Sequence, residues 1–242
     1  MNRLGGVQLF GILRRWKRNT SANLARAILA DSKSYHPLGS YASARMKRPE
    51  EAFHQRWQMV SSVIQTYAVS NFCDLGCAEG YYVRHAAREH GIFAVGIDKD
   101  RKRLRSAVAL SELDKDWSCA FMQMKITSST IRAIPQFDMI ACMSLLQHVI
   151  HRSGLGEAKA LLCEIGKKVT KCMIFDMGGP NEDANEWASS LRMLAGDVDA
   201  NIASLLSECG FRNIAVLGHT TGYDTSAVRG LFVAEPSLCP AA

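Results

Sequence analysis

Two carboxylates and a glycine turn form the first candidate binding site in this sequence. The stretch 74–80 (DLGCAEG) follows a short apolar run, and a helical pattern begins after it; a second apolar run, 93–97, ends in Asp98. Glycine lets the backbone pass close to a ligand, and a helix N-terminus presents unpaired N–H groups. An acid at the end of the neighbouring strand can hold ribose hydroxyls. The pattern predicts a site for a nucleoside-like cofactor.

The glycine spacing separates two cofactor classes. Gly76 and Gly80 do not complete the G-x-G-x-x-G sequence that cradles the pyrophosphate of a dinucleotide. A flavodoxin-like domain, in which the glycines serve only packing, is the structural alternative. Asp74 and Asp98 at two successive strand ends favour the cofactor site.

The elements that must position these residues alternate from residue 71 onward, which indicates a parallel sheet with helices on both faces. The predicted strands are 71–75, 93–98, 118–125, 137–143, 171–177, 211–218 and 228–234. The predicted helices in this part are 80–90, 100–113, 155–169 and 198–209. The last two strands are joined without a helical pattern, which favours an antiparallel hairpin. Ligands of such sheets bind beyond the carboxyl ends of the strands.

A further helix is predicted over 50–68, immediately before the first strand. Its large apolar residues recur at helical spacing and predict a face that packs on the sheet. These residues are Phe53, Trp57, Val60, Ile64 and Tyr67. With 242 residues and 48% hydrophobic content, the chain can form one full domain with a modest extension. We expect an N-terminal extension and cap loop over 1–48 and the main domain over 49–242.

The net charge of +6 is confined to the N-terminus. Residues 1–30 contain six basic residues and no acid, so the rest of the chain is balanced. This balance disfavours a nucleic-acid partner. The segment 7–30 combines arginines with aromatic and aliphatic residues, which suits a helix lying on an anionic membrane surface. A targeting segment, a solvated tail and a helix packed on the body are the alternatives.

The eight cysteines include no C-x-x-C pair. Several fall in predicted strands or on apolar helix faces, which is typical of reduced core thiols in a cytoplasmic protein. No metal site is expected from them. No apolar run approaches the length of a membrane span.

The motifs together resemble the class I S-adenosylmethionine (SAM) methyltransferases, whose first motif is D-x-G-x-x-x-G. Within this family the chain is similar to the methyltransferase module of bacterial O-antigen chain-terminating kinase–methyltransferases. The resemblance rests on 74–82 (DLGCAEGYY), 95–98 (VGID), 137–154 (FDMIACMSLLQHVIHRSG), a loop that carries Trp187, and the turn 218–220 (GHT). The upstream 35–37 loop and Gln55-Arg56 also fit. The resemblance covers roughly residues 34 to 235.

The resemblance implies an α/β fold: a Rossmann-like, seven-stranded, mostly parallel sheet with a C-terminal antiparallel hairpin and an N-terminal helical cap. It implies SAM as the cofactor and S-adenosyl-L-homocysteine (SAH) as the product. The third strand lacks the acid with which many relatives bind adenine, so backbone groups, Gln123, Met124 or Ile126 must replace it. The cofactor-binding residues implied are Asp74, Gly76, Cys77, Ala78, Gly80, Asp98, Lys99, Met124 and Met143.

For catalysis the resemblance points to the segment after the fourth strand. His148 is the first candidate for a base that takes a proton from an acceptor hydroxyl, and His151 is the second. Tyr35 is a third catalytic candidate, from the loop that covers the SAM pocket in these relatives. The alternative for both histidines is that they only shape the pocket.

The acceptor implied is a glycan hydroxyl or glycan-linked group in bacterial surface polysaccharide synthesis, with transfer at the cytoplasmic side or on the inner membrane. Methylation of RNA, such as tRNA, and of a small metabolite are the enzymatic alternatives. A SAM-binding partner subunit without catalytic activity is the alternative from another class.

Overall fold

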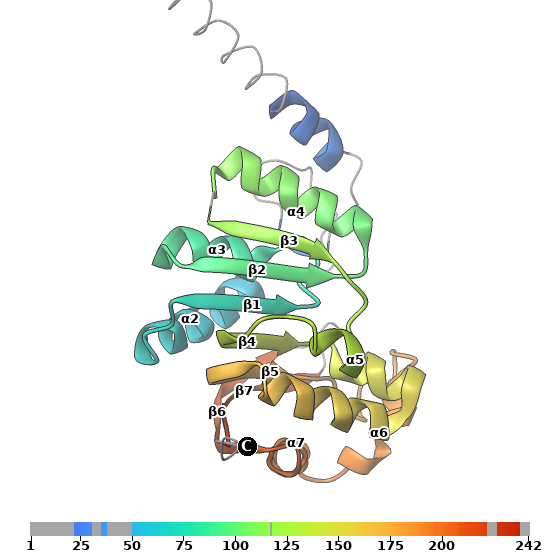
Figure 1. Ribbon diagram of the computed structural model, residues 1–242. Coiled ribbons are helices and arrows are strands. Elements are labelled where there is room, and N and C mark those ends of the chain that lie inside the picture. The colour runs from blue at the N-terminus through green and yellow to red at the C-terminus, as the bar shows by residue number, and fades with distance from the viewer. Residues whose placement is uncertain (1–21, 31–34, 38–49, 117, 222–226, 238–242) are drawn as a thin grey trace, which may run out of the picture.

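The computed structural model describes residues 22–30, 35–37, 50–116, 118–221 and 227–237 (Figure 1). Its centre is a seven-stranded sheet in the order β3-β2-β1-β4-β5-β7-β6. Strand β7 runs antiparallel to its two neighbours β5 and β6, and the other neighbouring strands pair in parallel. The strands are β1 (Asn71–Leu75), β2 (Phe93–Asp98), β3 (Cys119–Gln123), β4 (Phe137–Met143), β5 (Val169–Asp176), β6 (Phe211–Thr221) and β7 (Val228–Pro236).

Helices cover both faces of this sheet, as the alternating pattern predicts. One face packs against α2 (Glu50–Thr66), α3 (Tyr81–His90) and α4 (Arg101–Asp114). The other packs against α5 (Ser128–Ile131), α6 (Leu146–Gly166), the 3₁₀ helix η2 (Ala188–Leu194) and α7 (Val198–Glu208). The predicted fold class, including the C-terminal antiparallel hairpin, is confirmed.

The helix before the first strand packs as its spacing predicts. Phe53, Trp57, Val60 and Ile64 are buried in one core cluster with residues of the sheet. Tyr67 is only partly buried, and its hydroxyl donates to Glu235 Oε1 at 3.0 Å. Helix α2 therefore forms a fixed wall beside the strands.

Residues 22–30 form a helix whose Ala25 and Leu29 pack against Ala109 and Leu110 of α4. Most of the basic segment 7–30 lies outside the described residues, so its predicted contact with a membrane stays a prediction. In the described part of the chain, no helix has the length and apolar character needed to cross a membrane.

Several predicted boundaries are wrong. Strand β3 ends at Gln123 instead of 125. Helix α6 begins at Leu146, is interrupted at Gly154 (φ 83°, ψ 168°) and ends at Gly166, because Val169 already pairs with Phe137 in the sheet. Strand β6 continues through 218–221, predicted as a loop, because this polar stretch pairs with β7 up to Val228.

Candidate active site

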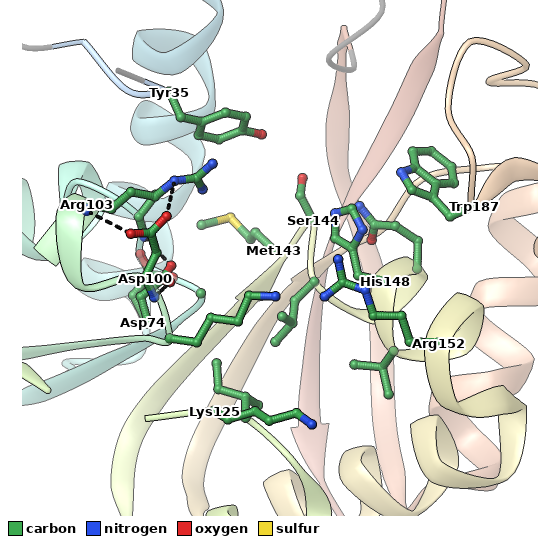
Figure 2. A pocket seen from close by; sticks show the side chains of 18 of the residues that line it. Tyr35, Asp74, Asp100, Arg103, Lys125, Met143, Ser144, His148, Arg152 and Trp187 are labelled. Carbon is green, nitrogen blue, oxygen red and sulfur yellow. Dashed lines mark hydrogen bonds and ion pairs between the residues drawn. The ribbon is translucent and has the colours of Figure 1, made fainter. Parts of the chain in front are cut away.

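A cavity of about 920 Å³ lies at the carboxyl ends of the parallel strands. Asp74 of β1, Asp98 of β2 and Met143 of β4 all line it. Figure 2 shows Asp74, Asp100 and Arg103 on one side and Ser144, His148 and Trp187 on the other, with Met143 between them. Ligand pockets measure about 300–1,000 Å³, so this cavity lies at the large end of that range.

The glycine turn after β1 is fixed against β2. The N–H groups of Gly76 and Cys77 donate to the carbonyl of Ile97 at 2.8 and 3.1 Å. Gly76 and Gly80 have φ values of 82° and 71°, in the left-handed region that favours glycine. Between them Ala78 also has a positive φ, 47°. The turn thus carries the chain along the cavity wall into the N-terminus of α3.

Asp98 connects this turn to the start of α4. Its Oδ2 accepts from the N–H of Ala78 at 2.9 Å, and its Oδ1 accepts from the N–H of Asp100 at 2.8 Å. Each carboxylate oxygen keeps a second acceptor site. The side chain is therefore held in one orientation and can still accept hydrogen bonds from a ligand in the cavity.

Asp74, in contrast to Asp98, is buried without hydrogen bonds from the described residues that would hold its carboxyl group. Its carboxyl group makes no hydrogen bond to any residue that the structure describes, although it lines the cavity. Burial, together with the charges of Asp98 and Asp176, raises the pKa of Asp74 to about 8. A cationic ligand group beside it would favour the ionised form.

The segment 35–37 is tied to the glycine turn by Glu79. The N–H groups of Tyr35 and His36 donate to Oε1 and Oε2 of Glu79, both at 3.1 Å. Burial raises the pKa of Glu79, although these N–H groups act in the opposite direction. The guanidinium of Arg103 lies 5.4 Å from the centroid of the Tyr35 ring. Tyr35 thereby becomes part of the cavity wall.

The other end of the cavity rests on a buried polar network. The N–H and hydroxyl of Ser144 donate to Asp176 Oδ1 at 2.5 and 3.1 Å. Asp176 pairs with Nη1 of Arg56 at 2.5 Å, and Arg56 donates to Thr220. Burial is the largest single influence and lowers the pKa of Arg56, but Asp176, Tyr82 and Tyr35 together more than offset it, and the pKa rises. Ser144 has a φ of 52°, a strained value for a residue with a side chain.

A second buried pair fixes Trp187. Arg229 donates from Nε and Nη2 to the two carboxylate oxygens of Glu182, at 2.7 and 2.5 Å. Its third nitrogen, Nη1, donates to Ser144 Oγ at 3.0 Å, and its guanidinium lies 5.6 Å from the Trp187 ring centroid. A Cβ at Gly178 would overlap the Trp187 ring, so glycine is required there. The aromatic ring is held rigidly at the cavity edge.

His148 faces this ring at the start of α6. The two ring centroids are 6.3 Å apart in an edge-to-face arrangement. Burial and the nearby cations Arg152, Lys99 and Arg229 lower the pKa of His148 below its ordinary value. Its imidazole is therefore neutral at pH 7 and can accept a proton.

Most of the residues implied by the resemblance line one cavity: Tyr35, Asp74, Gly76, Ala78, Asp98, Lys99, Met143 and His148. Four others lie outside that lining. Cys77 is buried behind the turn, Gly80 faces the Phe121 ring, and Met124 packs against the core. Nδ1 of His151 lies 3.0 Å from Ser190 Oγ, on an exposed part of α6.

Several residues that line the same cavity were not among the predicted site residues. They are Arg56, Ser144, Gln147, Arg152, Asn185 and Arg229. They come from distant segments, and no local spacing distinguishes them. The strongest sequence signal for these residues was the polar stretch 181–186 immediately before Trp187. Within the described residues, no group of three or more His, Cys, Asp or Glu side chains could hold a metal ion.

Comparison with known proteins agrees with this geometry. Residues 72–166 match the model of the methyltransferase domain family. The O-antigen chain terminator bifunctional methyltransferase/kinase WbdD of Escherichia coli is 31% identical over 114 residues. These residues make up 46% of this chain and 16% of WbdD. The chain therefore spans a small part of that relative.

Solved structures of similar shape agree on the fold. The bifunctional kinase-methyltransferase WbdD superposes with a TM-score of 0.70 and 20% identity, over 87% of this chain and 46% of that one. The N-terminal domain of EvdMO1, solved in the presence of SAH and D-fucose, gives 0.62 and 19%, over 90% and 97%. Residues 72–166 thus match a methyltransferase domain, and the chain has the fold of these methyltransferases with a cavity at its strand ends.

Proposed function

We propose that this chain transfers the methyl group of SAM to a hydroxyl of a glycan or glycan-linked group in bacterial surface polysaccharide synthesis. One observation carries the proposal: a single cavity has two buried acids at one end and a neutral histidine beside a buried tryptophan at the other. The first end suits a nucleoside cofactor, and the second suits a sugar with a hydroxyl to be deprotonated.

At the cofactor end, the residues fit the chemical groups of SAM. Asp98, with acceptor sites left on both oxygens, would accept hydrogen bonds from the ribose hydroxyls. Asp74, buried without a hydrogen-bond partner among the described residues, would face the positively charged methionine part. The Gly76 turn lets the backbone approach the ligand closely. When bound, SAM supplies a methyl group on a positively charged sulfur.

At the acceptor end, His148 would take the proton of the acceptor hydroxyl as its oxygen bonds to the methyl carbon. The carbon–sulfur bond breaks in the same step, and SAH and the methylated acceptor leave. Trp187 offers an aromatic face of the kind that packs against sugar rings. The buried pairs Arg56–Asp176 and Arg229–Glu182 hold this end rigid, which favours alignment of the two reacting atoms.

The similar proteins support a sugar acceptor. WbdD is named as an O-antigen chain terminator, and the EvdMO1 domain was solved with D-fucose. A lipid-linked glycan would lie at a membrane, and the basic segment 7–30 would suit contact with its anionic surface. Sedimentation with anionic and with neutral vesicles would test that contact.

Transfer of labelled methyl groups tests the proposal. The protein is incubated with labelled SAM and a panel of hexoses, deoxyhexoses and oligosaccharide fragments of bacterial surface glycans. RNA and small-metabolite pools serve as competing substrates. We expect label in at least one sugar, lost in His148→Gln. Label only in RNA, or in no sugar at all, would overturn the glycan acceptor.

A further inference from the structure

Two side-chain amides line the cavity without a hydrogen-bond partner in the described part of the chain. The Gln147 side chain is buried, and its Oε1 has no partner among the described residues. Nδ2 of Asn185 is likewise enclosed and without a partner there. Both residues belong to the lining of the active-site cavity. Buried polar atoms are nearly always paired, so two such atoms in one cavity require an explanation.

Several neighbouring polar groups of this cavity are paired with one another. The Ser144 hydroxyl bonds to both Asp176 and Arg229, and the Arg229 guanidinium also bonds to Glu182. The side chains of Ser144, Glu182 and Arg229 thus satisfy one another, whereas the two amides have no hydrogen-bond partner among the described residues. A bound molecule is the natural partner for such amides.

The backbone holds both amides at the acceptor end. Gln147 precedes His148 in the first turn of α6. The N–H of Asn185 donates to the Glu182 carbonyl at 2.9 Å, and Glu182 is held by its ion pair with Arg229. The contact between His148 and Trp187 brings these two segments together. Both amides therefore belong to the acceptor half of the cavity, away from Asp98.

We propose that Gln147 and Asn185 bind hydroxyl groups of the acceptor sugar other than the one that is methylated, and thereby select the sugar. This inference rests on the proposed glycan acceptor. An amide offers one donor group and one acceptor atom, and a hydroxyl both donates and accepts. The last side-chain torsion of Asn and Gln is broad and roughly two-fold, so a small rotation can turn either end toward the ligand. Neutral amides match neutral hydroxyls without burying a charge.

The test uses the sugar that the wild-type protein methylates in the labelled panel, which includes D-fucose. Gln147→Met and Asn185→Leu keep the side-chain volume and remove the amide. Each is expected to lower kcat/KM for the sugar about tenfold, chiefly through KM, and to leave the KM for SAM unchanged. Gln136→Met is the matched control, because the Gln136 amide donates to the Lys167 carbonyl at 3.2 Å and is remote from this cavity.

Deoxy forms of the same sugar show whether the two amides bind sugar hydroxyls or only support the structure of the cavity. In the wild-type protein, removing a recognised hydroxyl should cost about as much as removing its amide. In the matching variant, the same deoxy sugar should lose little more. Wild-type transfer to sugars with unchanged KM in both variants would overturn this inference alone. Failure to methylate any sugar would overturn the proposed function and this inference with it.

Discussion

The Asp176 carboxylate lies 2.5 Å from Nη1 of Arg56, and both side chains are almost completely buried. The pair joins helix α2 to the end of β5, directly beneath Ser144, which donates to the same carboxylate. One ion pair thus connects the helix before the first strand to the acceptor end of the cavity.

Breaking this pair should destabilise the fold strongly. Arg56→Met leaves Asp176 buried without its cation, which typically costs about 3–5 kcal/mol of unfolding free energy. Urea denaturation measures it, with Lys159→Met as a control on the exposed pair with Glu208, where solvent screens the interaction and little loss is expected. The double variant Arg56→Met with Asp176→Asn should lose less than the sum of the single changes. Equal losses for Arg56→Met and Lys159→Met would contradict the role of the pair.

SAM binding should depend on pH through Asp74. The pKa of Asp74 is raised to about 8, so the unliganded carboxyl is mostly protonated at pH 7. A cationic ligand favours the ionised form, so binding should release a proton, and affinity should rise by up to about tenfold per pH unit between pH 6 and 8. Calorimetry in buffers of different ionisation enthalpy counts the released protons. Asp74→Asn should abolish the release; an identical release in that variant would assign it elsewhere.

The same raised pKa affects the stability of the unliganded protein. The folded form binds the Asp74 proton more tightly than the unfolded chain, whose carboxyl titrates near pH 4. The stabilising contribution is therefore complete below about pH 4 and is lost as pH rises toward 8. Asp74→Asn should flatten this part of the stability profile, as measured by urea unfolding across the range. An unchanged profile would show that Asp74 does not titrate there.

Two histidines on one helix give a matched test of catalysis. His148 lines the cavity, whereas His151 lies beside Ser190 outside it. His148→Gln should lower kcat by about 10²–10⁴ with SAM binding unchanged, and His151→Gln should remain near wild type. Because the pKa of His148 is lowered, the wild-type rate should already be level above about pH 6.5. Similar losses in both variants would argue against His148 as the base.

Alanine substitutions at two glycines with left-handed backbone distinguish the cost of backbone strain from the cost of steric overlap. Gly80 and Gly91 flank α3 with φ values of 71° and 65°. A Cβ at Gly80 would meet the Phe121 ring at 2.5 Å, whereas at Gly91 nothing lies within 4 Å. Gly91→Ala should cost about 1–2 kcal/mol from backbone strain alone, and Gly80→Ala clearly more. Thermal and urea unfolding compare them, and equal costs would mean that Phe121 moves aside freely.

The sequence was sufficient for the sheet because the signals for it are local. Short apolar runs, the turn at 74–80 and the acid at Asp98 all appear within a few residues. The predicted helix begins at 155, and the part of α6 before Gly154 was missed because the polar and apolar residues of 146–153 show no clear helical stripe.

The acceptor end was less predictable because its contacts are distant in sequence. Arg229 and Glu182 are separated by 47 positions, and Arg56 and Thr220 by 164. Glu79 lay inside the motif itself, yet its link to the 35–37 segment appears only when the chain is folded. Such pairs leave no periodic pattern in one sequence.

A calorimetric titration of SAH into the wild-type protein and Asp98→Ala tests whether the cofactor binds at the ends of β1 and β2. The exposed acid Asp183, changed to alanine, serves as the control, and thermal unfolding verifies that each variant is folded. We expect micromolar binding in the wild type and in Asp183→Ala, and binding weakened at least about tenfold in folded Asp98→Ala. Absence of SAH binding in the wild type, or equal binding in Asp98→Ala, would contradict the placement of the cofactor at the ends of β1 and β2.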